Sequence, residues 1–217
     1  MFKKTLLAAL VSGVMVSGVQ AAEIQPNGYL FGNVGRSDAD TPRFVKELDS
    51  ELSAFGEATG LDFGSSFDEN DTAFKVGAGI QLNRHVAVEF QYLDLGKAAY
   101  KASMTDGIDT ISAKMAGDTE GFGANLVGTL PFDRFKLFGK VGYHKLKTKV
   151  KEEIELVGEG TLFDESESHT EWVNSLGVGA SFAFTPTVEL VAEYEQYRDV
   201  ADEYDVDFAS IGLRYNF

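Results

Sequence analysis

Short segments in which apolar and polar residues alternate recur along most of the chain. The last segment, residues 209–217, places on one face Ala209, Ile211, Leu213, Tyr215 and Phe217, and on the other Ser210, Gly212, Arg214 and Asn216. A period of two is the side-chain period of a β-strand. Tyr215 and Phe217 on the apolar face of a terminal strand are typical of a barrel in lipid, where aromatic side chains line the membrane interface.

Seven earlier segments show the same alternation and predict seven more strands: 28–37, 72–82, 86–94, 121–130, 135–149, 171–184 and 188–196. Short turns at 83–85, 131–134 and 185–187 separate three pairs of these strands. Longer connections at 38–71, 95–120, 151–170 and 197–204 separate the others. Eight strands joined in this way favour an up-and-down order.

The predicted fold class is all-β, an eight-stranded antiparallel transmembrane barrel with short periplasmic turns and long acidic extracellular loops. No apolar run after residue 21 approaches the ~20 residues that a spanning helix needs. A chain of this kind enters a membrane only as a closed barrel. Short turns face the periplasm in such barrels, so both termini are expected there. Composition alone, with 44% hydrophobic residues, would fit a soluble β-sandwich equally well.

The N-terminus predicts secretion. A basic start with Lys3 and Lys4 precedes an apolar run, and Val19-Gln20-Ala21 offers the small residues that a signal peptidase requires. We therefore expect residues 1–21 to be a signal peptide and residues 22–217 to form one barrel domain in the cell outer membrane. A membrane-anchor helix is the alternative, but the apolar run is short for it.

Charge and composition exclude several partners. The formal charge of −15 becomes −17 once Lys3 and Lys4 leave with the signal, which argues against nucleic acid. The chain has no cysteine, so disulfides and thiolate metal sites are excluded. No cofactor and no metal are expected. Four loop carboxylates could offer oxygen ligands to Ca²⁺, although the spacing of a dedicated loop is missing and a solvated surface is the simpler interpretation: Asp62, Asp68, Glu69 and Asp71.

Five charged residues fall on lumen-facing positions of the predicted strands: Lys75, Glu89, Lys140, Glu193 and Arg214. Because inward side chains fill a barrel of eight strands, these charges must share a small space. Unpaired charges are costly there and paired ones are tolerated. We predict that Lys140 and Arg214 neutralise Glu89 and Glu193 and plug the lumen. A narrow conducting path for small solutes is the alternative.

Other features concern the surface. An aromatic girdle is expected from Tyr92, Tyr143, Trp172, Phe184 and Tyr194. Pro42 to Phe55 predicts a short amphipathic helix within the first long connection, which would serve as a lid on the barrel rim, a lipid-interface helix or a partner-binding helix. Four lysines alternate at the outer end of the fifth strand, where they would pair with acidic neighbours or contact anionic lipopolysaccharide: Lys145, Lys147, Lys149 and Lys151.

Two stretches carry a family resemblance. Residues 73–83 read Ala-Phe-Lys-Val-Gly-Ala-Gly-Ile-Gln-Leu-Asn, and residues 86–96 read Val-Ala-Val-Glu-Phe-Gln-Tyr-Leu-Asp-Leu-Gly. They resemble the eight-stranded outer-membrane barrel family typified by the transmembrane domain of outer membrane protein A. Residues 185–197 and the terminal strand are similar to the seventh and eighth strands of that family. The resemblance covers essentially the whole mature chain, and we expect a barrel-only member.

The resemblance implies that a C-terminal Phe, here Phe217 with Tyr215 before it, is the insertion signal read by the barrel assembly machinery. It also implies a lumen ion-pair network that includes Glu89. The sequence departs from the family at three lumen positions, where Asn33, Ser181 and Val191 replace charged residues.

Function is less constrained than fold. We expect a monomer in contact with outer-membrane lipid and lipopolysaccharide, with a structural or surface-interaction role and an extracellular partner for its acidic loops. Enzymatic modification of lipid A is a weaker alternative, and no enzyme activity is predicted. Such chemistry needs a nucleophile beside a base, and Ser168 and His169 point apart if they are adjacent in a strand.

Overall fold

The computed structural model describes residues 27–157, 160–201 and 204–217, and every structural statement below concerns these residues. Their elements, in chain order, are β1 (Asn27–Ala39), α2 (Arg43–Thr59), β2 (Asp62–Asp68), β3 (Asn70–Asn83), β4 (Val86–Thr105), β5 (Thr110–Phe132), β6 (Phe135–Leu156), β7 (Gly160–Ala183), β8 (Val188–Val200) and β9 (Tyr204–Asn216). The expected signal peptide, residues 1–21, lies outside the described part of the chain.

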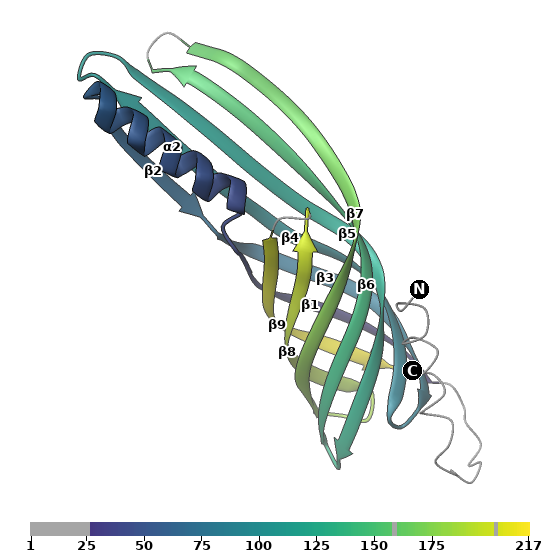
Figure 1. The fold of residues 1–217 in the computed structure, drawn as a ribbon. Helices are drawn as coiled ribbons and strands as arrows, with labels where there is room; N and C mark the ends of the chain where they lie inside the picture. Colours follow the sequence, from purple (N-terminus) through teal and green to yellow (C-terminus); the bar gives the residue numbers. More distant parts are fainter. Residues whose placement is uncertain (1–26, 158–159, 202–203) are drawn as a thin grey trace, which may run out of the picture.

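Eight of these strands close into a ring. The pairing order is β4-β3-β1-β9-β8-β7-β6-β5, and a further β4–β5 pairing closes it (Figure 1). Every neighbouring pair is antiparallel. β1 meets β9 with Leu30 opposite Tyr215, and the Phe217 amide donates to the Gly28 carbonyl at 3.0 Å. The predicted eight-stranded antiparallel barrel is therefore confirmed.

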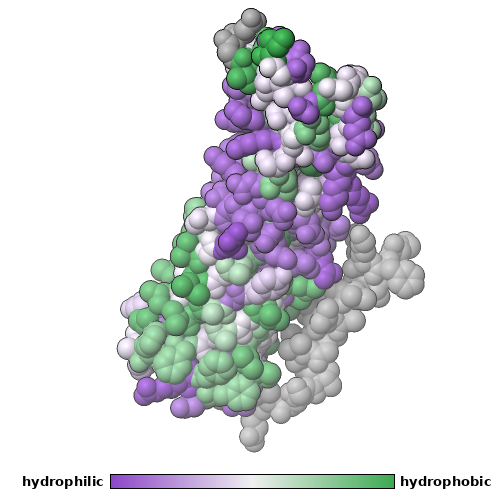
Figure 2. All heavy atoms as spheres, turned by 90° about the vertical axis from the view of Figure 1, so that its left-hand side faces the viewer, coloured by the Kyte–Doolittle hydropathy of each residue, from purple (hydrophilic) through white to green (hydrophobic). Residues whose placement is uncertain are grey.

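Apolar side chains cover the outside of the ring near the short turns. On β9 the exposed side chains are Ile211, Leu213, Tyr215 and Phe217, as the terminal alternation predicts. Comparable residues on the other strands of the ring complete a belt. Figure 2 shows this belt as the mainly green lower part of the molecule, below a mainly hydrophilic upper part.

Two of the predicted loops are largely strand, which corrects the sequence analysis. Most of 95–120 belongs to β4 and β5, and most of 151–170 belongs to β6 and β7. These four strands rise far beyond the rest of the ring (Figure 1). The alternation fails there because both faces of a sheet in water can be polar. Cross-strand pairing still holds the strands together. We call this part of β4–β7, with β2, the extension.

The first long connection contains α2 and β2, and β2 pairs only with β4. The predicted helix is present, beginning at Arg43 and ending at Thr59. Val45 packs with Tyr100 and Ala102, which belong to the lumen-side face of β4. Tyr100 Oη donates to Asp49 Oδ1 at 2.9 Å. The helix therefore lies on the inner face of the extension (Figure 1).

The apolar stripe predicted for this helix is divided in the structure. Leu48 and Leu52 pack with Val45, whereas Phe44 and Phe55 are 42% and 55% exposed. The two phenylalanines lie together at one margin of the stripe, on the side away from Val45. Only the side of the predicted face around Val45, Leu48 and Leu52 is buried.

Candidate functional site in the barrel interior

Large side chains enter the barrel from alternate positions of every strand, and glycines opposite some of them leave room. Gly79 is the clearest case, since a Cβ added there would lie 2.1 Å from Cζ of Tyr29. Tyr29 and Phe31 can therefore cross the interior near the short-turn end, where both are buried. This packing fits the expectation that eight strands enclose a filled space rather than a channel.

The five predicted lumen charges meet in the middle of the barrel. Lys140 Nζ lies 2.8 Å from Glu89 Oε2 and 2.7 Å from Glu193 Oε2. Arg214 Nη2 contacts Glu89 Oε1 at 3.1 Å, and Lys75 forms an ion pair with Glu193. All five side chains are at least nine-tenths buried. Lys140 and Arg214 thus face the carboxylates to which the sequence analysis assigned them.

Three further charged residues extend this group. Glu195 Oε2 lies 2.6 Å from Lys75 Nζ, and Glu189 Oε1 lies 2.5 Å from Lys136 Nζ. Arg214 Nη1 lies 4.0 Å from Glu189 Oε2 and so connects the Glu189–Lys136 pair to the central group of charges. The result is an unbroken series of alternating charges, the interior network: Glu195, Lys75, Glu193, Lys140, Glu89, Arg214, Glu189 and Lys136. Four carboxylates face four cations, so the formal charges cancel.

Glu189, Glu195 and Lys136 are not among the five charges predicted for the lumen. Alternation had already indicated their direction, because Glu189 and Glu195 share the face of Glu193 and Lys136 shares that of Lys140. Which charges meet depends on the stagger between strands. Lys75, for example, lies on β3 and reaches Glu195 on β8 across the interior.

Neutral side chains complete the coordination of each carboxylate in the network. Tyr29 Oη donates to Glu89 at 2.8 Å, Asn33 Nδ2 to Glu193 at 3.1 Å, and Ser175 Oγ to Glu195 at 2.9 Å. Ser181 Oγ donates to Glu189 at 2.9 Å. Asn33 and Ser181 are two of the positions where the family resemblance implies a charge. Here they supply neutral polar groups, and the balance of charge is reached through other residues.

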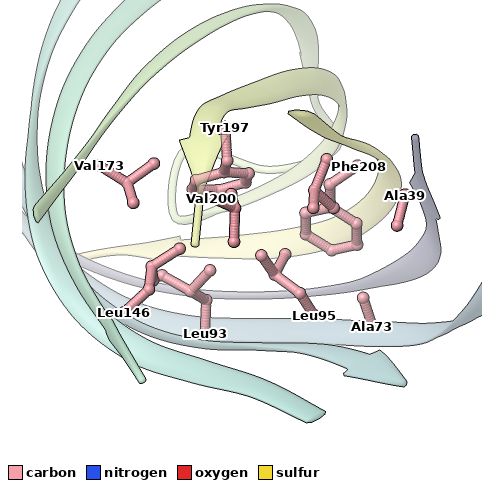
Figure 3. Packing of buried hydrophobic residues seen from close by; sticks show 10 residues of the cluster. Ala39, Ala73, Leu93, Leu95, Leu146, Val173, Tyr197, Val200 and Phe208 are labelled. Atoms are coloured by element: carbon pink, nitrogen blue, oxygen red, sulfur yellow. The ribbon is translucent and has the colours of Figure 1, made fainter. Parts of the chain in front are cut away.

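Two apolar groups of side chains flank the center of the network. The first group lies next to Lys140, Glu89 and Glu193 on the side of the short turns, and it comprises Tyr29, Phe31, Ala87, Val127, Phe138 and Val191. The other, toward the extension, comprises Ala39, Ala73, Leu93, Leu95, Leu146, Val173, Tyr197, Val200, Val206 and Phe208. Figure 3 shows nine labelled members of this second group, which we call the upper apolar layer, clustered between the strands. Leu93, Tyr197, Val200 and Phe208 are fully buried.

Polar side chains lie between part of the network and the upper apolar layer, while Lys75 Nζ reaches the layer directly, 5.5 Å from the ring centroid of Phe208. Gln91 Nε2 lies 3.1 Å from His144 Nε2 and 3.3 Å from Tyr197 Oη. The His144 ring meets the Tyr197 ring edge-on, with centroids 5.2 Å apart. His144 is therefore in the lumen and fully buried.

The five predicted girdle residues all lie on the outer surface and are between 37% and 57% exposed: Tyr92, Tyr143, Trp172, Phe184 and Tyr194. Tyr143 and Trp172 stack with centroids 4.8 Å apart. Tyr92 Oη donates to Glu120 at 2.7 Å, where the apolar belt meets the extension. Phe184 lies at the short-turn end, beside Phe182.

The residues considered for catalysis and for calcium binding can be located in the structure. Ser168 and His169 are exposed neighbours on β7, so their side chains point to opposite faces. No group of three or more His, Asp or Glu side chains within the described ranges could hold a metal ion. Asp71, one of the four proposed calcium ligands, accepts hydrogen bonds from the Thr72 and Lys97 amides.

Among the described residues, no helix has both the length and the apolar character needed to cross a membrane.

A closed antiparallel ring with an apolar outer belt and a filled, charge-balanced interior defines a membrane β-barrel. The chain belongs to the family of the outer membrane protein beta-barrel domain, whose profile matches residues 6–217. The apolar belt is thus the lipid-facing surface, and the protein is located in the outer membrane. The short turns face the periplasm and the extension faces the outside.

The chain is similar to several solved structures. Ail, the attachment invasion locus protein of Yersinia pestis in complex with the heparin analogue sucrose octasulfate, aligns with a TM-score of 0.52 at 16% identity, over 89% of this chain and 100% of that chain. Neisserial surface protein A aligns at 15% identity with a TM-score of 0.45, covering 88% and 97%. The N-terminal barrel of Pseudomonas aeruginosa OprF aligns at 10% identity with a TM-score of 0.45, over 89% of this chain and 100% of that chain. No curated protein matches the chain in sequence. The resemblance to the family of outer membrane protein A is confirmed.

Proposed function

We propose that this protein is a closed outer-membrane barrel with a structural and surface-interaction role. Its transmembrane part anchors the extension, and the extension presents a folded sheet and helix to molecules outside the cell. The interior network serves to hold the barrel shut, and ions do not pass along it. The protein acts as a monomer, because the ring closes within one chain.

The observation that carries this proposal is the order of layers in the lumen. A conducting path needs a continuous column of water, and Leu93, Tyr197 and Phe208 occupy the column directly above the polar side chains. Below them, Phe31 and Phe138 lie beside Lys140, whose Nζ is 5.5 Å and 5.4 Å from the two ring centroids. The central charges around Lys140 consequently lie between these two apolar groups, and the buried charges are paired with one another, as burial requires.

Liposome swelling tests the proposal against the narrow-pore alternative. Proteoliposomes with the refolded protein are placed in isotonic solutions of arabinose, glucose and sucrose. We expect swelling rates equal to those of protein-free liposomes for all three sugars. Rates that rise with protein content and fall with sugar size would overturn the closed-barrel proposal and support the pore.

Lipopolysaccharide contact is the lipid-facing part of the proposed role. Lys145, Lys147, Lys149 and Lys151 alternate outward on β6, directly beyond Tyr143 in the belt. Lys149 pairs with Glu120 at 3.1 Å, whereas Lys145 lies opposite Trp172 and Phe122. A row of cations beyond an aromatic girdle suits the phosphates of the outer leaflet. Four Lys→Gln changes should weaken binding of lipopolysaccharide to the detergent-solubilised barrel, and unchanged binding would contradict this part.

Assembly and processing follow the same proposal. Phe217, with Tyr215, is the C-terminal signal for the barrel assembly machinery, and residues 1–21 are a cleaved signal peptide. No enzyme activity is proposed, since Ser168 and His169 form no dyad. Unchanged mass spectra of lipid A on overexpression are the expected result, and new lipid A species would overturn it.

A further inference from the structure

One side of the extension ends in an open strand edge. β7 pairs with β6 along its whole length, but its pairing with β8 begins only at Asn174. Near that point the Ala201 amide donates to Glu171 Oε1. From Thr161 to Thr170, no described residue provides a backbone partner on the outer side of β7. We call this ten-residue segment the β7 edge.

The opposite side of the extension is closed by the chain itself. β2 forms that edge, and it is only seven residues long. α2 lies against β2, with Gly56 so close that an added Cβ would lie 3.2 Å from Phe63 Cβ. A short strand covered by a helix is one way in which proteins protect a sheet edge from further pairing. The β7 edge lacks such protection among the described residues, although its unpaired amides and carbonyls can bind another strand.

The charged side chains of the β7 edge determine which kind of strand can pair with it. Asp164, Glu165 and Glu167 are exposed on the β7 edge and form no ion pair with any described residue. On β6, Glu152 lies opposite Glu165 and Glu153 lies opposite Asp164. Glu155 raises the pKa of Glu153 through a hydrogen bond and like-charge repulsion. A second copy of this edge would bring carboxylates against carboxylates, so a cationic strand fits and self-association does not.

The two faces of the β7 edge make the partner more specific. Phe163, Glu165 and Glu167 lie opposite Ile154, Glu152 and Val150, so they belong to the lumen-side face. Ser166, Ser168 and Thr170 lie opposite three lysines on the outer face: Lys151, Lys149 and Lys147. A matching strand would carry Lys or Arg at alternate positions on the face shared with Glu165 and Glu167. Between them it would carry small hydroxyl residues, because the outer face is already basic.

We infer that the β7 edge binds an extended cationic polypeptide segment of an extracellular protein by adding it as an antiparallel strand. This rests on the proposed surface-interaction role and names its surface and its kind of partner. Main-chain hydrogen bonds supply affinity in such strand addition, and alternate side chains supply specificity. The heparin analogue bound by Ail is a polyanion, whereas this acidic edge selects the opposite charge.

The test uses the full chain, refolded in lipid nanodiscs, and a labelled ten-residue peptide of alternating Lys and Thr. We expect saturable binding by fluorescence anisotropy. The double variant Glu165→Gln, Glu167→Gln should bind about tenfold more weakly, which corresponds to about 1.4 kcal/mol. The matched control Glu47→Gln, Glu57→Gln removes the same charge from α2 and should bind as the parent does. Equal weakening in both double variants would overturn the inference, because general attraction to an acidic protein predicts that result.

Strand addition is tested separately from charge. N-methylation of the peptide at every Lys blocks one hydrogen-bonding side, and N-methylation at every Thr blocks the other, without changing any charge. For an antiparallel strand on one edge, one methylated peptide should bind like the parent and the other should not. Hydrogen exchange should slow at alternate amides between Thr161 and Thr170. Equal affinity of both methylated peptides, or unchanged exchange on β7, would overturn the inference.

These outcomes are independent of the liposome experiment. If the peptide does not bind and the liposomes do not swell, the β7-edge inference is refuted and the closed-barrel proposal stands. Sugar permeation with intact peptide binding would refute the closed lumen and leave the β7 edge in place.

Discussion

At the scale of single residues, Lys140 is the center of the barrel interior. Its ammonium group touches Glu89 and Glu193, and both neighbours have further partners in Arg214 and Lys75. Removing one member of a buried ion pair leaves an uncompensated charge in a poorly hydrated space. The cost of such a change therefore measures how tightly the network is held.

The change Lys140→Met should lower the free energy of unfolding by about 3–5 kcal/mol, the usual cost of breaking a buried pair. Urea unfolding in lipid vesicles, followed by the fluorescence of Trp172, measures this. The matched change Lys149→Met removes an exposed lysine that pairs with Glu120. It should cost less than about 1 kcal/mol, as for other surface pairs. Equal effects of the two changes would show that the interior network does not stabilise the barrel.

The sequence could predict which residues face inward but not all of their partners. Alternation gives the direction of Glu89, Lys140 and Glu193, since it depends only on strand geometry. The pairing of Lys75 with Glu195 depends on strand stagger, which one sequence does not specify. Similarly, nothing local to Asn33 indicates that its amide would donate to Glu193.

At the scale of elements, α2 and the four long strands were the least complete part of the prediction. Apolar periodicity located the helix correctly, because one side of it is buried on the extension. The same signal is weak in 110–120 and 160–170, where β5 and β7 stand in water and neither face alternates cleanly. The sequence pattern therefore predicted the lipid-facing part of each strand. The predicted strands end earlier on the outer side than β4–β7 do in the structure.

Docking of α2 should depend on pH through Tyr100. Burial, and then the hydrogen bond to Asp49, raise the pKa of Tyr100 from 10.0 to about 12. The neutral phenol favours the docked helix, so its contribution is complete below pH 10 and is lost as the pH rises through 12. A fluorophore on the single-cysteine variant Glu57→Cys should gain mobility across this range. Tyr100→Phe should remove the transition from that window, and an unchanged transition in Tyr100→Phe would contradict this assignment.

The aromatic girdle gives a second prediction at this scale. Trp172 is the only tryptophan of the chain, is 56% exposed and stacks on Tyr143 at the outer border of the belt. Aromatic side chains of this kind lie at the level of lipid headgroups. Nitroxide-labelled lipids should therefore quench its fluorescence more strongly from a label near the headgroup than from one near the end of the acyl chain. The reverse order would place Trp172 inside the bilayer and contradict the girdle.

At the scale of the whole molecule, the chain combines two different surfaces on one closed sheet. The belt exposes large apolar side chains on the strands of the ring, while the extension carries carboxylates at the outer ends of β6 and β7. The eight charges of the interior network cancel, so they contribute nothing to the overall formal charge of −15. Fold and location could therefore be predicted from the sequence, whereas the full set of charge pairs in the interior required the structure.

A barrel whose ends are joined by β1 and β9 should resist detergent. Unheated protein in dodecyl sulfate should migrate differently from a boiled sample on a gel, because the closed hydrogen-bonded ring stays compact. The variant Phe217→Ala keeps the ring residues and should retain the shift once refolded in vitro. Identical mobility of unheated and boiled parent protein would argue against a stable closed ring.

The central claim is that paired charges and apolar layers close the interior, and single-channel recording in planar bilayers tests it most directly. The account predicts no steady conductance from the parent protein at moderate voltage. It also predicts none from the matched variant Lys149→Met, which alters only the outer surface. Steady channels in the parent whose conductance changes in Glu89→Gln or Lys140→Met would mean that ions pass along the network, and would contradict the closed barrel.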